Sequence, residues 1–413
     1  MTSPPRSGVA DVLNRTPRFA ETAWPGYTGS DMSAPLDPIP AARATIAEHT
    51  ERGLALLAEL VSQNSFTLNL PGVNRVQARL AEELCSLGLV VRELPCSDRG
   101  SVLVAETHPG MAHPLLLVAH ADTVHPESSE YASLWSEGDR LLGPGVYDLK
   151  GSLVQILLTL TALREQGRLG EVPLKILINS AEENGSPATV AAIRDEARGA
   201  RAALVLESGR VGGAIVLERS GCAEVRLTVE GVPAHAGNQF FEGRSAITGL
   251  ARALVDAAKL SDQARGVTVN PGRLEGGGPL NVVADRAVCD FDIRAASLAD
   301  LEGAIRALGH LDAGGCATRL EVFDQCPPLA ATTESRRLAE EYRAAAAEVG
   351  SSLEILPRVG GLSDANIISG VGVPVIDALG PVGGKAHTRE EFVEAASIPR
   401  RALELFAFIA RRS

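Results

Sequence analysis

The chain has 413 residues, with 39 basic against 51 acidic side chains and a formal net charge of −12. This length exceeds what a single hydrophobic core usually supports, so we expect two domains. No nucleic acid partner is expected, because phosphate binding requires a basic face. Hydrophobic residues make up 45% and charged residues 22% of the chain, which is typical of a soluble globular protein.

Neither a membrane partner nor a disulfide framework is expected. No apolar run reaches the roughly 18 residues that a transmembrane helix requires. The six cysteines include no CxxC pair, and in a chain of this length they are interpreted as scattered core thiols. Residues 1–44 are rich in Pro, Ser, Thr and Gly and lack a signal-peptide pattern. We therefore expect a disordered leader and a cytoplasmic protein. Met32 offers a second plausible start.

The segment that follows the leader alternates between two kinds of pattern. Apolar residues at helical spacing predict helices over 41–62 and 73–87. Short apolar runs then alternate with further helical patterns. The predicted strands are 115–119, 174–178 and 202–206, and the predicted helices are 152–164 and 189–197. Alternating strands and helices predict an α/β domain with a mostly parallel sheet covered on both faces.

The pattern changes after residue 217. Residues 223–230 (AEVRLTVE) alternate apolar and polar, as a half-exposed strand does. The elements expected after it are a helix at 245–259, strands at 266–269 and 287–294, a helix at 298–308 and a strand at 318–323. This βαββαβ order predicts a smaller α+β domain over 218–328, inserted into the first domain. The first domain would then comprise 45–217 and 329–413, ending with a helix at 335–349, a strand at 373–378 and a helix from residue 398.

Acidic residues and histidines follow the predicted strands of the first domain. They are His120 and Asp122, Asp148, Glu182 and Glu183, Glu207, and finally His387. Groups beyond the carboxyl ends of strands in an open parallel sheet converge on one crevice. Imidazole nitrogens and carboxylate oxygens are common zinc ligands in hydrolytic sites. The pattern therefore predicts a metal site at this edge of the sheet.

The types and spacing of these residues suit a pair of metal ions. Two ions that share a water need a bridging ligand, which a carboxylate such as Asp148 can supply. The side chains of adjacent Glu182 and Glu183 diverge, so one can bind metal while the other takes a proton from water. Asp122 is close enough to His120 to orient its imidazole. Each residue alone has a simpler interpretation, as a surface histidine, a turn aspartate or a helix cap. Their joint occurrence at strand ends indicates chemistry.

Five other histidines are interpreted as ordinary surface or core residues. They are His49, His108, His113, His125 and His310. Two other enzyme classes are excluded by missing motifs. The chain has no GxSxG elbow of a serine hydrolase and no GxxxxGK[ST] loop of a nucleotide-binding protein.

From about residue 45 to the C-terminus, the chain resembles the M20 metallopeptidases, especially their glutamate carboxypeptidase branch. The motifs that carry the resemblance stand in the family's order: HADTV, GPGVYDLKG, AEEN, AHAG, GGLSDAN and GPVGGKAHT. The resemblance implies a catalytic domain of the zinc-peptidase type with an inserted lid or dimerisation domain. It therefore also implies a homodimer.

The resemblance implies a site for two zinc ions, with cobalt or manganese as alternatives. His120 and Glu207 would bind one ion, and Glu183 and His387 would bind the other. Asp148 would bridge both ions, and the peptide bond after it is expected to be cis, as in family members.

Catalytic and substrate-binding roles also follow from the resemblance. Glu182 would be the general base, and Asp122 would orient the imidazole of the first histidine ligand. His235 resembles a residue, often supplied by the partner subunit, that polarises the scissile carbonyl. Asn281 and Arg294 resemble residues that hold the substrate's terminal carboxylate, for which a guanidinium is suited because it binds carboxylate bidentately. A surface strand arginine is the simpler interpretation of Arg294.

The implied reaction is hydrolysis of an amide or peptide bond adjacent to a free carboxylate, with release of a glutamate-like C-terminal amino acid from a small-molecule substrate. Three alternatives remain open at this point: an N-acyl amino acid deacylase, a dipeptidase, and a pathway-specific amide-processing enzyme of specialised metabolism. A non-catalytic metal-binding protein on the same fold is disfavoured. Such a protein has no chemical need for a free glutamate beside the metal ligands.

Overall fold

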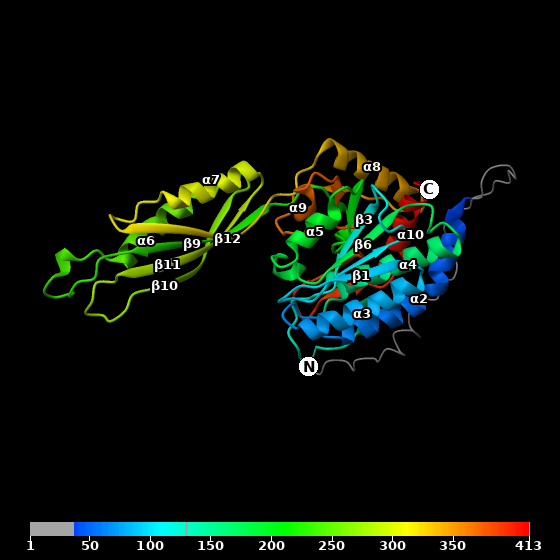
Figure 1. Ribbon diagram of the computed structural model, residues 1–413, viewed down its shortest axis with the longest axis horizontal. Helices are drawn as coiled ribbons and strands as arrows, with labels where there is room; N and C mark the ends of the chain where they lie inside the picture. Colours follow the sequence, from blue (N-terminus) through cyan, green and yellow to red (C-terminus); the bar gives the residue numbers. More distant parts are fainter. Residues whose placement is uncertain (1–36, 129–130, 413) are drawn as a thin grey trace. The chain divides into compact units, whose positions relative to one another are not determined.

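The computed structural model describes residues 37–128 and 131–412, and these form two compact units (Figure 1). Unit 1 contains residues 37–217, 332–356 and 363–412, and unit 2 contains Glu218–Ala331 and Pro357–Leu362. The short segment 357–362 differs from the predicted division, which assigned it to the catalytic domain. It groups with unit 2 because the buried Arg219 side chain donates a hydrogen bond to the carbonyl of Gly361 at 3.0 Å.

The central sheet of unit 1 has the strand order β1–β2–β6–β3–β7–β14. Its strands are β1 (Val90–Leu94), β2 (Val102–Glu106), β3 (Leu115–His120), β6 (Leu174–Asn179), β7 (Ala202–Val205) and β14 (Val375–Ile376). The strands from β6 to β14 run parallel, which confirms the predicted sheet. Strands β1 and β2 add an antiparallel edge that the sequence analysis did not predict.

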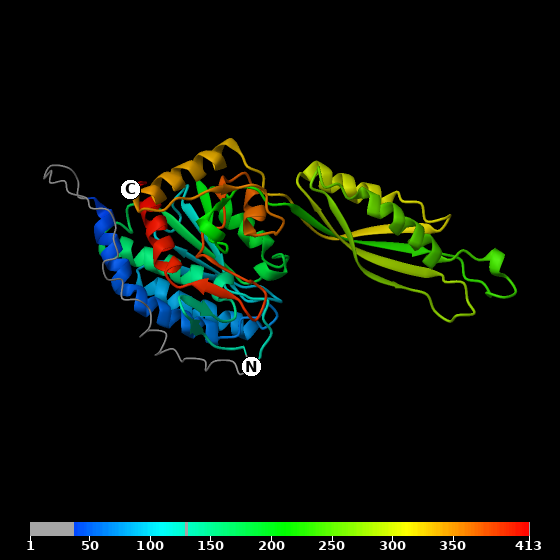
Figure 2. The same ribbon diagram turned by 180° about the vertical axis from the view of Figure 1, so that it is seen from behind.

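Helices cover both faces of this sheet. Helix α4 (Gly151–Glu165) connects β3 to β6 on one side of β3, and α5 (Val190–Ala197) connects β6 to β7 on the other. The connection from β3 to β6 runs along the sheet in one direction, and the connection from β6 to β7 runs in the opposite direction. Because both connections are expected to be right-handed, the two helices lie on opposite faces of the sheet. Helix α10 (Ser397–Ala410), red and on the near side in Figure 2, packs against α4 together with α2 (Pro38–Ser62). The other helices of unit 1 are α3 (Leu70–Ser86), α8 (Thr333–Glu348) and α9 (Asp364–Ser369).

Helix α2 begins earlier than the predicted domain boundary. The Asp37 side chain caps it by accepting a hydrogen bond from the backbone N–H of Ile39 at 3.0 Å. Pro38 occupies the first turn, where its missing N–H costs nothing, and Ala42 is fully buried. The prediction of a disordered leader over 1–44 is therefore wrong for residues 38–44, while residues 1–36 lie outside the described part of the chain.

One segment is long and apolar enough to cross a membrane by composition alone. This segment is Val146–Glu165, and it comprises the π-helical turn η1 (Val146–Lys150) and α4. It was not predicted from the sequence, where no apolar run of sufficient length was recognised. Within the protein, 89% of its most apolar window is buried, because α2 and α10 pack against α4. Its hydropathy is explained by its position as the core helix of unit 1.

A buried arginine joins α10 to two loops of unit 1. The side chain of Arg401 is fully buried. It donates hydrogen bonds to the carbonyls of Gly380 and Ala378, both at 2.8 Å, and of Gly213 at 3.1 Å. Its charge is balanced by the buried carboxylate of Glu404 at 2.8 Å. The guanidinium therefore satisfies backbone carbonyls that have no access to water.

We expect Arg401→Met to lower the free energy of unfolding by roughly 3–5 kcal/mol, because it leaves a buried carboxylate without its cation. Denaturant unfolding of the metal-free protein measures this change. Arg400→Met is the matched control, because Arg400 is the exposed neighbour in the same helix and its loss should cost less than about 0.5 kcal/mol. Equal unfolding midpoints for the two variants would contradict the structural role of Arg401.

A small second sheet of unit 1 presents the C-terminal part of the predicted site. In the order β15–β16–β5–β4, its strands are Gly383–Gly384, Phe392–Glu394, Arg140–Leu142 and Trp135–Glu137. The sequence analysis predicted none of these strands, because two or three residues are too few for a recognisable period. The hairpin between β15 and β16 carries His387. A further short parallel pair joins β8 (Ile215–Val216) to β13 (Ile355–Leu356).

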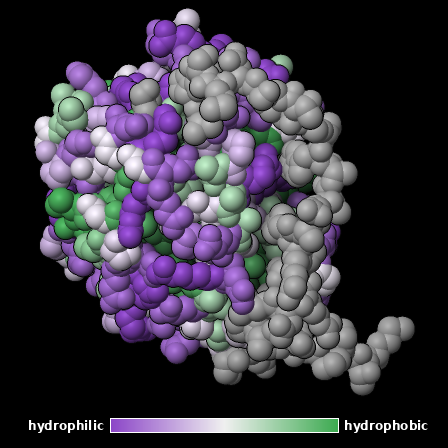
Figure 3. All heavy atoms as spheres, turned by 90° about the vertical axis from the view of Figure 1, so that its right-hand side faces the viewer, coloured by the Kyte–Doolittle hydropathy of each residue, from purple (hydrophilic) through white to green (hydrophobic). Residues whose placement is uncertain are grey.

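Ion pairs join the C-terminal residues to α8, and Figure 3 shows one face of the protein. Arg411 pairs with Glu348 at the end of α8, and Arg412 pairs with Glu341 of the same helix. Most atoms on this face that carry a hydropathy colour belong to hydrophilic residues.

Unit 2 is an antiparallel sheet with two helices on one face, which confirms the predicted βαββαβ order. Its strand order is β10–β11–β9–β12. The strands are β9 (Gly221–Glu230), β10 (Thr268–Gly276), β11 (Arg286–Ala295) and β12 (Ala317–Cys326), and the helices are α6 (Ala246–Ala257) and α7 (Leu298–Gly309). Alternate residues of β9, such as Val225 and Leu227, point into the apolar core beneath the helices, as the alternating pattern predicts.

Strand β10 is longer than the predicted 266–269. Its sequence continues through Pro271 and Gly272, two residues that usually argue against a strand. The proline is tolerated because β10 lies at the edge of the sheet, where the missing N–H breaks no inner ladder. A shift of register between Pro271 and Arg273 absorbs the irregularity.

Candidate metal centre

Strand β3 places His120 at the carboxyl edge of the central sheet. The side chain is 1% exposed, and its Nδ1 lies 3.0 Å from the carbonyl oxygen of Asp122. Because a carbonyl only accepts, Nδ1 carries the proton and donates it. In the neutral imidazole the lone pair is then on Nε2, which faces the carboxylates of the site, as a metal ligand requires.

The fully buried carboxylate of Asp122 organises the residues around it. One oxygen lies 3.4 Å from Nδ1 of His120. The carboxylate also accepts hydrogen bonds from the Thr67 hydroxyl at 2.7 Å and from the backbone N–H groups of Glu182 and Glu183 at 3.1 and 3.2 Å. The Asp122 carboxylate therefore lies beside the imidazole, and it also fixes the turn that carries the two glutamates. Sequence reasoning missed this second contact and the part of Thr67 in it.

Asp148 lies between two histidines. One of its carboxylate oxygens is 3.4 Å from Nε2 of His120, and the other is 3.4 Å from Nε2 of His387. Burial disfavours the charged carboxylate, but pairing with the two imidazoles outweighs it and lowers the pKa of Asp148 well below its usual range. The peptide bond between Asp148 and Leu149 is cis, as the resemblance implies. The carboxylate thus lies between the two imidazoles.

Three glutamates complete the cluster. Oε2 of Glu183 lies 3.1 Å from Nε2 of His387, while Glu207 and Glu182 approach Nε2 of His120 to 3.7 and 3.9 Å. Burial, reinforced by the charge of Glu207, raises the pKa of Glu182 well above its ordinary value, and burial raises that of Glu183 to about 6. Pairing with Asp148 and then Glu183 raises the pKa of His387 to about 10.

This donor set fits divalent cations. Among the described residues, Nε2 of His120 is buried without a hydrogen-bond partner and faces the carboxylates of Asp148 and Glu207. Ligand atoms of His120, Asp148 and Glu183 lie within 4.8 Å of one another, and so do those of His120, Glu182 and Glu207. Carboxylates held this close repel one another unless a cation lies between them. Mixed nitrogen and oxygen donors suit zinc, cobalt or manganese.

A buried network behind the Glu182–Glu183 turn escaped sequence reasoning. The Asn179 side chain accepts hydrogen bonds from two backbone N–H groups of the turn, at 2.7 and 3.2 Å. The same side chain and the Ser186 hydroxyl both donate to the carboxylate of Asp364 at 2.9 Å. Burial raises the pKa of Asp364 to about 6. The signal was the GGLSDAN motif, which contains Asp364 but was given no role.

Unit 2 contains the other three predicted site residues, His235, Asn281 and Arg294. It brings the first two of them together. His235 pairs with a residue next to Asn281, and the backbone N–H of Ala236 donates to the Asn281 carbonyl at 2.9 Å. Nδ1 of His235 accepts hydrogen bonds from the backbone N–H groups of Gly237 and Asn238, both at 3.1 Å. The neutral imidazole therefore carries its proton on Nε2, which remains available as a donor.

Arg294 lies at the other end of unit 2. It stands near the end of β11, whereas Asn281 precedes the start of that strand. The length of β11 between Ala287 and Arg294 is roughly 23 Å at the usual rise per residue. The guanidinium donates to both carboxylate oxygens of Asp292 at 3.0 Å and to the Gly360 carbonyl at 3.2 Å. The structure therefore does not bring Arg294 together with His235 within one copy of this unit.

The sequence is similar to those of known peptidases and deacetylases. The sequence model of peptidase family M20/M25/M40 matches residues 116–411. Carboxypeptidase G2 of Pseudomonas sp. (strain RS-16) is 28% identical over 354 residues, which cover 84% of this chain and 85% of that protein. N-acetyl-L-citrulline deacetylase of Xanthomonas campestris is 28% identical over 301 residues, covering 69% of this chain and 78% of that protein.

The fold is also shared with solved structures. The aminopeptidase PepT of Bacillus cereus superimposes with a TM-score of 0.74 at 23% identity, covering 88% of this chain and 98% of PepT. The range that the family model matches, 116–411, contains every residue of the cluster, from His120 to His387. The chain therefore belongs to peptidase family M20/M25/M40 and is a hydrolase of the metallopeptidase and amidohydrolase type.

Proposed function

We propose that this protein uses two divalent ions, preferably zinc, to hydrolyse an amide bond next to a free carboxylate, releasing a glutamate-like C-terminal amino acid. The observation that carries the proposal is the position of Asp148, with one oxygen 3.4 Å from each of two histidines. A carboxylate in this position can bridge two ions about 3.5–4 Å apart, close enough to share one water.

The short contacts suggest how the ligands divide between the ions. His120 and Glu207, 3.7 Å apart, would hold one ion. His387 and Glu183, 3.1 Å apart, would hold the other. The ligand atom of Glu183 also lies within 4.8 Å of those of His120 and Asp148, but its contact with His387 is the shorter, so we assign it there.

The remaining glutamate of the cluster is available for proton transfer. When bound, the ions would activate a water and polarise the substrate carbonyl. Glu182 would take the proton of that water and return it to the leaving nitrogen. Its backbone N–H is held by Asp122 at 3.1 Å, so the side chain is positioned without having to be a ligand itself.

The geometry of unit 2 favours a homodimer. The proton on Nε2 of His235 would be donated to the carbonyl oxygen as negative charge develops there. Asn281 and Arg294 would bind the terminal carboxylate of the substrate. Because Arg294 and His235 lie at opposite ends of unit 2, roughly 23 Å of strand apart, one copy cannot apply both to one small substrate. We therefore propose that His235 and Asn281 act on the site of a partner copy.

The choice of a glutamate carboxypeptidase rests on similarity. Carboxypeptidase G2 matches 84% of this chain, whereas N-acetyl-L-citrulline deacetylase matches 69% at the same 28% identity. A deacylase of small N-acyl amino acids is thus the second candidate, followed by a dipeptidase and a pathway-specific amide-processing enzyme. The first three candidates share a free carboxylate beside the scissile bond.

A substrate panel on metal-replete protein tests this proposal. It contains aromatic N-acyl-glutamates, N-acetyl amino acids and dipeptides, each paired with its C-terminal carboxamide and each assayed with and without chelator. We expect cleavage of the N-acyl-glutamates, loss of cleavage with chelator, and rates at least about 100-fold lower for the carboxamides, which leave the carboxylate-binding groups unpaired. Cleavage of N-acetyl amino acids alone would select the deacylase. Equal cleavage of acids and carboxamides would refute carboxylate recognition.

A further inference from the structure

The hairpin that presents His387 is held in an unfavourable backbone conformation. His387 has a φ of 66° and Lys385 a φ of 57°. For residues other than glycine, this left-handed region costs roughly 1–2 kcal/mol per residue. The His387 side chain is also 54% exposed, so packing contributes little to its position. A ligand in such a turn needs support from elsewhere in unit 1.

That support comes from Glu391, in the same hairpin, whose side chain is fully buried. One carboxylate oxygen accepts hydrogen bonds from the backbone N–H groups of Tyr147 and Asp148 at 2.9 and 3.0 Å. The other accepts from the backbone N–H of Gly145 at 3.2 Å and lies 2.8 Å from Nε2 of His125. The carboxylate thus binds the η1 turn, including the peptide N–H of the candidate bridging residue.

Further contacts tie the hairpin to the same region. The Tyr131 hydroxyl donates to the Thr388 carbonyl at 3.2 Å, and its ring packs edge-on against His125 with 5.0 Å between ring centroids. His125 was interpreted from the sequence as an ordinary residue. In the structure it is 9% exposed and fills the fourth position around the Glu391 carboxylate.

We propose that Glu391 is a positioning residue that fixes the separation of Asp148 and His387 and thereby sets the affinity of the second metal position, with His125 as its supporting partner. The inference rests on the proposed two-metal function. Glu391 touches no reacting atom in this scheme. It acts because the same carboxylate bonds the peptide N–H of Asp148 and belongs to the hairpin of His387, so moving it changes the distance between the two ligands.

The test is Glu391→Gln, which keeps the shape of the side chain but removes its charge and turns one acceptor into a donor that faces other donors. We expect zinc affinity at the position assigned to His387 and Glu183 to fall roughly 10–100-fold, the usual cost of losing a partner that orients metal ligands. Competition with a chromogenic chelator measures this affinity, and circular dichroism of the metal-free protein checks that the variant is folded.

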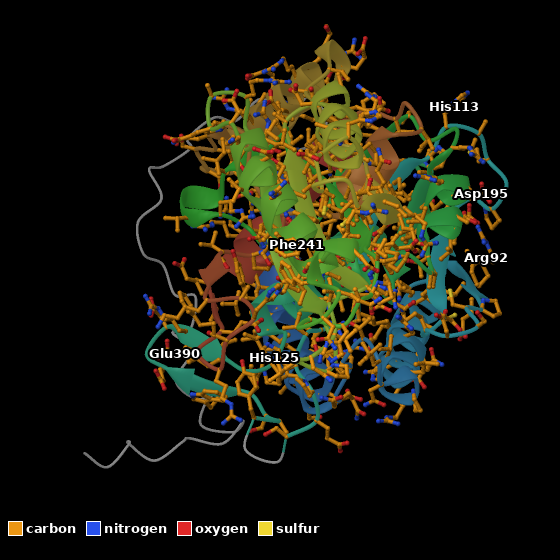
Figure 4. The ribbon with its side chains drawn as sticks, turned by 90° about the vertical axis from the view of Figure 1, so that its left-hand side faces the viewer. Arg92, His113, His125, Asp195, Phe241 and Glu390 are labelled. Carbon is orange, nitrogen blue, oxygen red and sulfur yellow. The ribbon has the colours of Figure 1, made fainter. Side chains whose placement is uncertain are left out.

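Glu390→Gln is the matched control, because it makes the same chemical change one residue away. Glu390 pairs with Lys385, and its side chain is 71% exposed. In Figure 4, Glu390 lies at the rim of the view, whereas His125 lies farther in. We expect the control to bind zinc as the unaltered protein does. The His125→Phe variant keeps the ring contact with Tyr131 but removes the hydrogen-bond donor to Glu391. It should also lower the zinc affinity of the position assigned to His387 and Glu183, by a smaller factor than Glu391→Gln.

The outcomes separate this inference from the proposed function. Unaltered protein that binds two ions, together with folded Glu391→Gln of the same affinity, overturns the positioning role alone. A Glu391→Gln variant that does not fold, together with unchanged affinity in His125→Phe, assigns Glu391 a merely structural role and also overturns the inference. Unaltered protein that binds no second ion refutes the two-metal function and the inference with it.

Discussion

The Glu182→Gln variant is expected to lose about 10²–10⁴-fold in kcat while it keeps its full metal content. Glutamine has the size of glutamate, but it cannot accept the proton of the attacking water. The turn should survive the change, because Asp122 holds it through backbone N–H groups and not through the Glu182 side chain. Turnover of an N-acyl-glutamate and metal analysis of the same sample measure the two quantities.

The neighbouring Glu183→Gln variant is the contrast for this experiment. Glu183 lies 3.1 Å from Nε2 of His387 and is assigned as a ligand, so its replacement should lower metal content as well as turnover. Full metal occupancy with intact turnover in Glu182→Gln would refute the assignment of the general base. Loss of metal from Glu182→Gln would instead make Glu182 a ligand.

The Asp148→Asn variant is expected to lose both tight metal binding and turnover. Its loss of affinity should exceed the roughly 10–100-fold that removal of a partner outside the ligand set costs, because Asp148 would contact both ions directly. An amide would present a neutral oxygen to one ion, and to the other a nitrogen whose lone pair is not available for coordination. Metal content after dialysis and the turnover of the dialysed protein measure the effect.

Asp139→Asn provides the matched control for this variant. Asp139 is exposed in the turn between β4 and β5, and its replacement should change neither metal content nor turnover. An Asp148→Asn protein that retains two ions after dialysis would contradict the bridging role. It would also remove the observation on which the two-metal proposal rests.

The parts of the fold that repeat a clear period were predictable from the sequence. Buried strands such as β3 are continuous apolar runs, and polar residues that stop such a run, like His120, mark its carboxyl end. Because parallel strands end at one edge, their terminal residues converge without any knowledge of the loops between them. That is why His120, Glu182, Glu183 and Glu207 could be placed together from strand ends, whereas Asp148 and His387 lie in η1 and in the β15–β16 hairpin.

Contacts between residues that lie far apart in the chain could not be predicted in this way. Asp364 bonds Asn179 across 185 positions, and Glu391 bonds the backbone of Asp148 across 243. Neither contact leaves a period or a spacing in one sequence. The short strands β15 and β16, which bring Glu391 to its partners, contain too few residues to be recognised.

One ion pair of unit 2 could have been predicted from the sequence but was not. Asp292 and Arg294 are two residues apart in a strand, so their side chains share a face. They form an ion pair at 3.0 Å in the structure. In the proposed function, a substrate carboxylate would therefore have to compete with the carboxylate of Asp292 for the guanidinium of Arg294.

Stepwise addition of zinc to metal-free protein, with release of glutamate from an N-acyl-glutamate as the readout, tests the two-metal claim most directly. We expect turnover to keep rising until a second equivalent of zinc is bound, to level off there, and to disappear when chelator is added. Turnover that reaches its maximum at one equivalent, or that persists in protein shown to be free of metal, would contradict a reaction that depends on two ions bridged by Asp148.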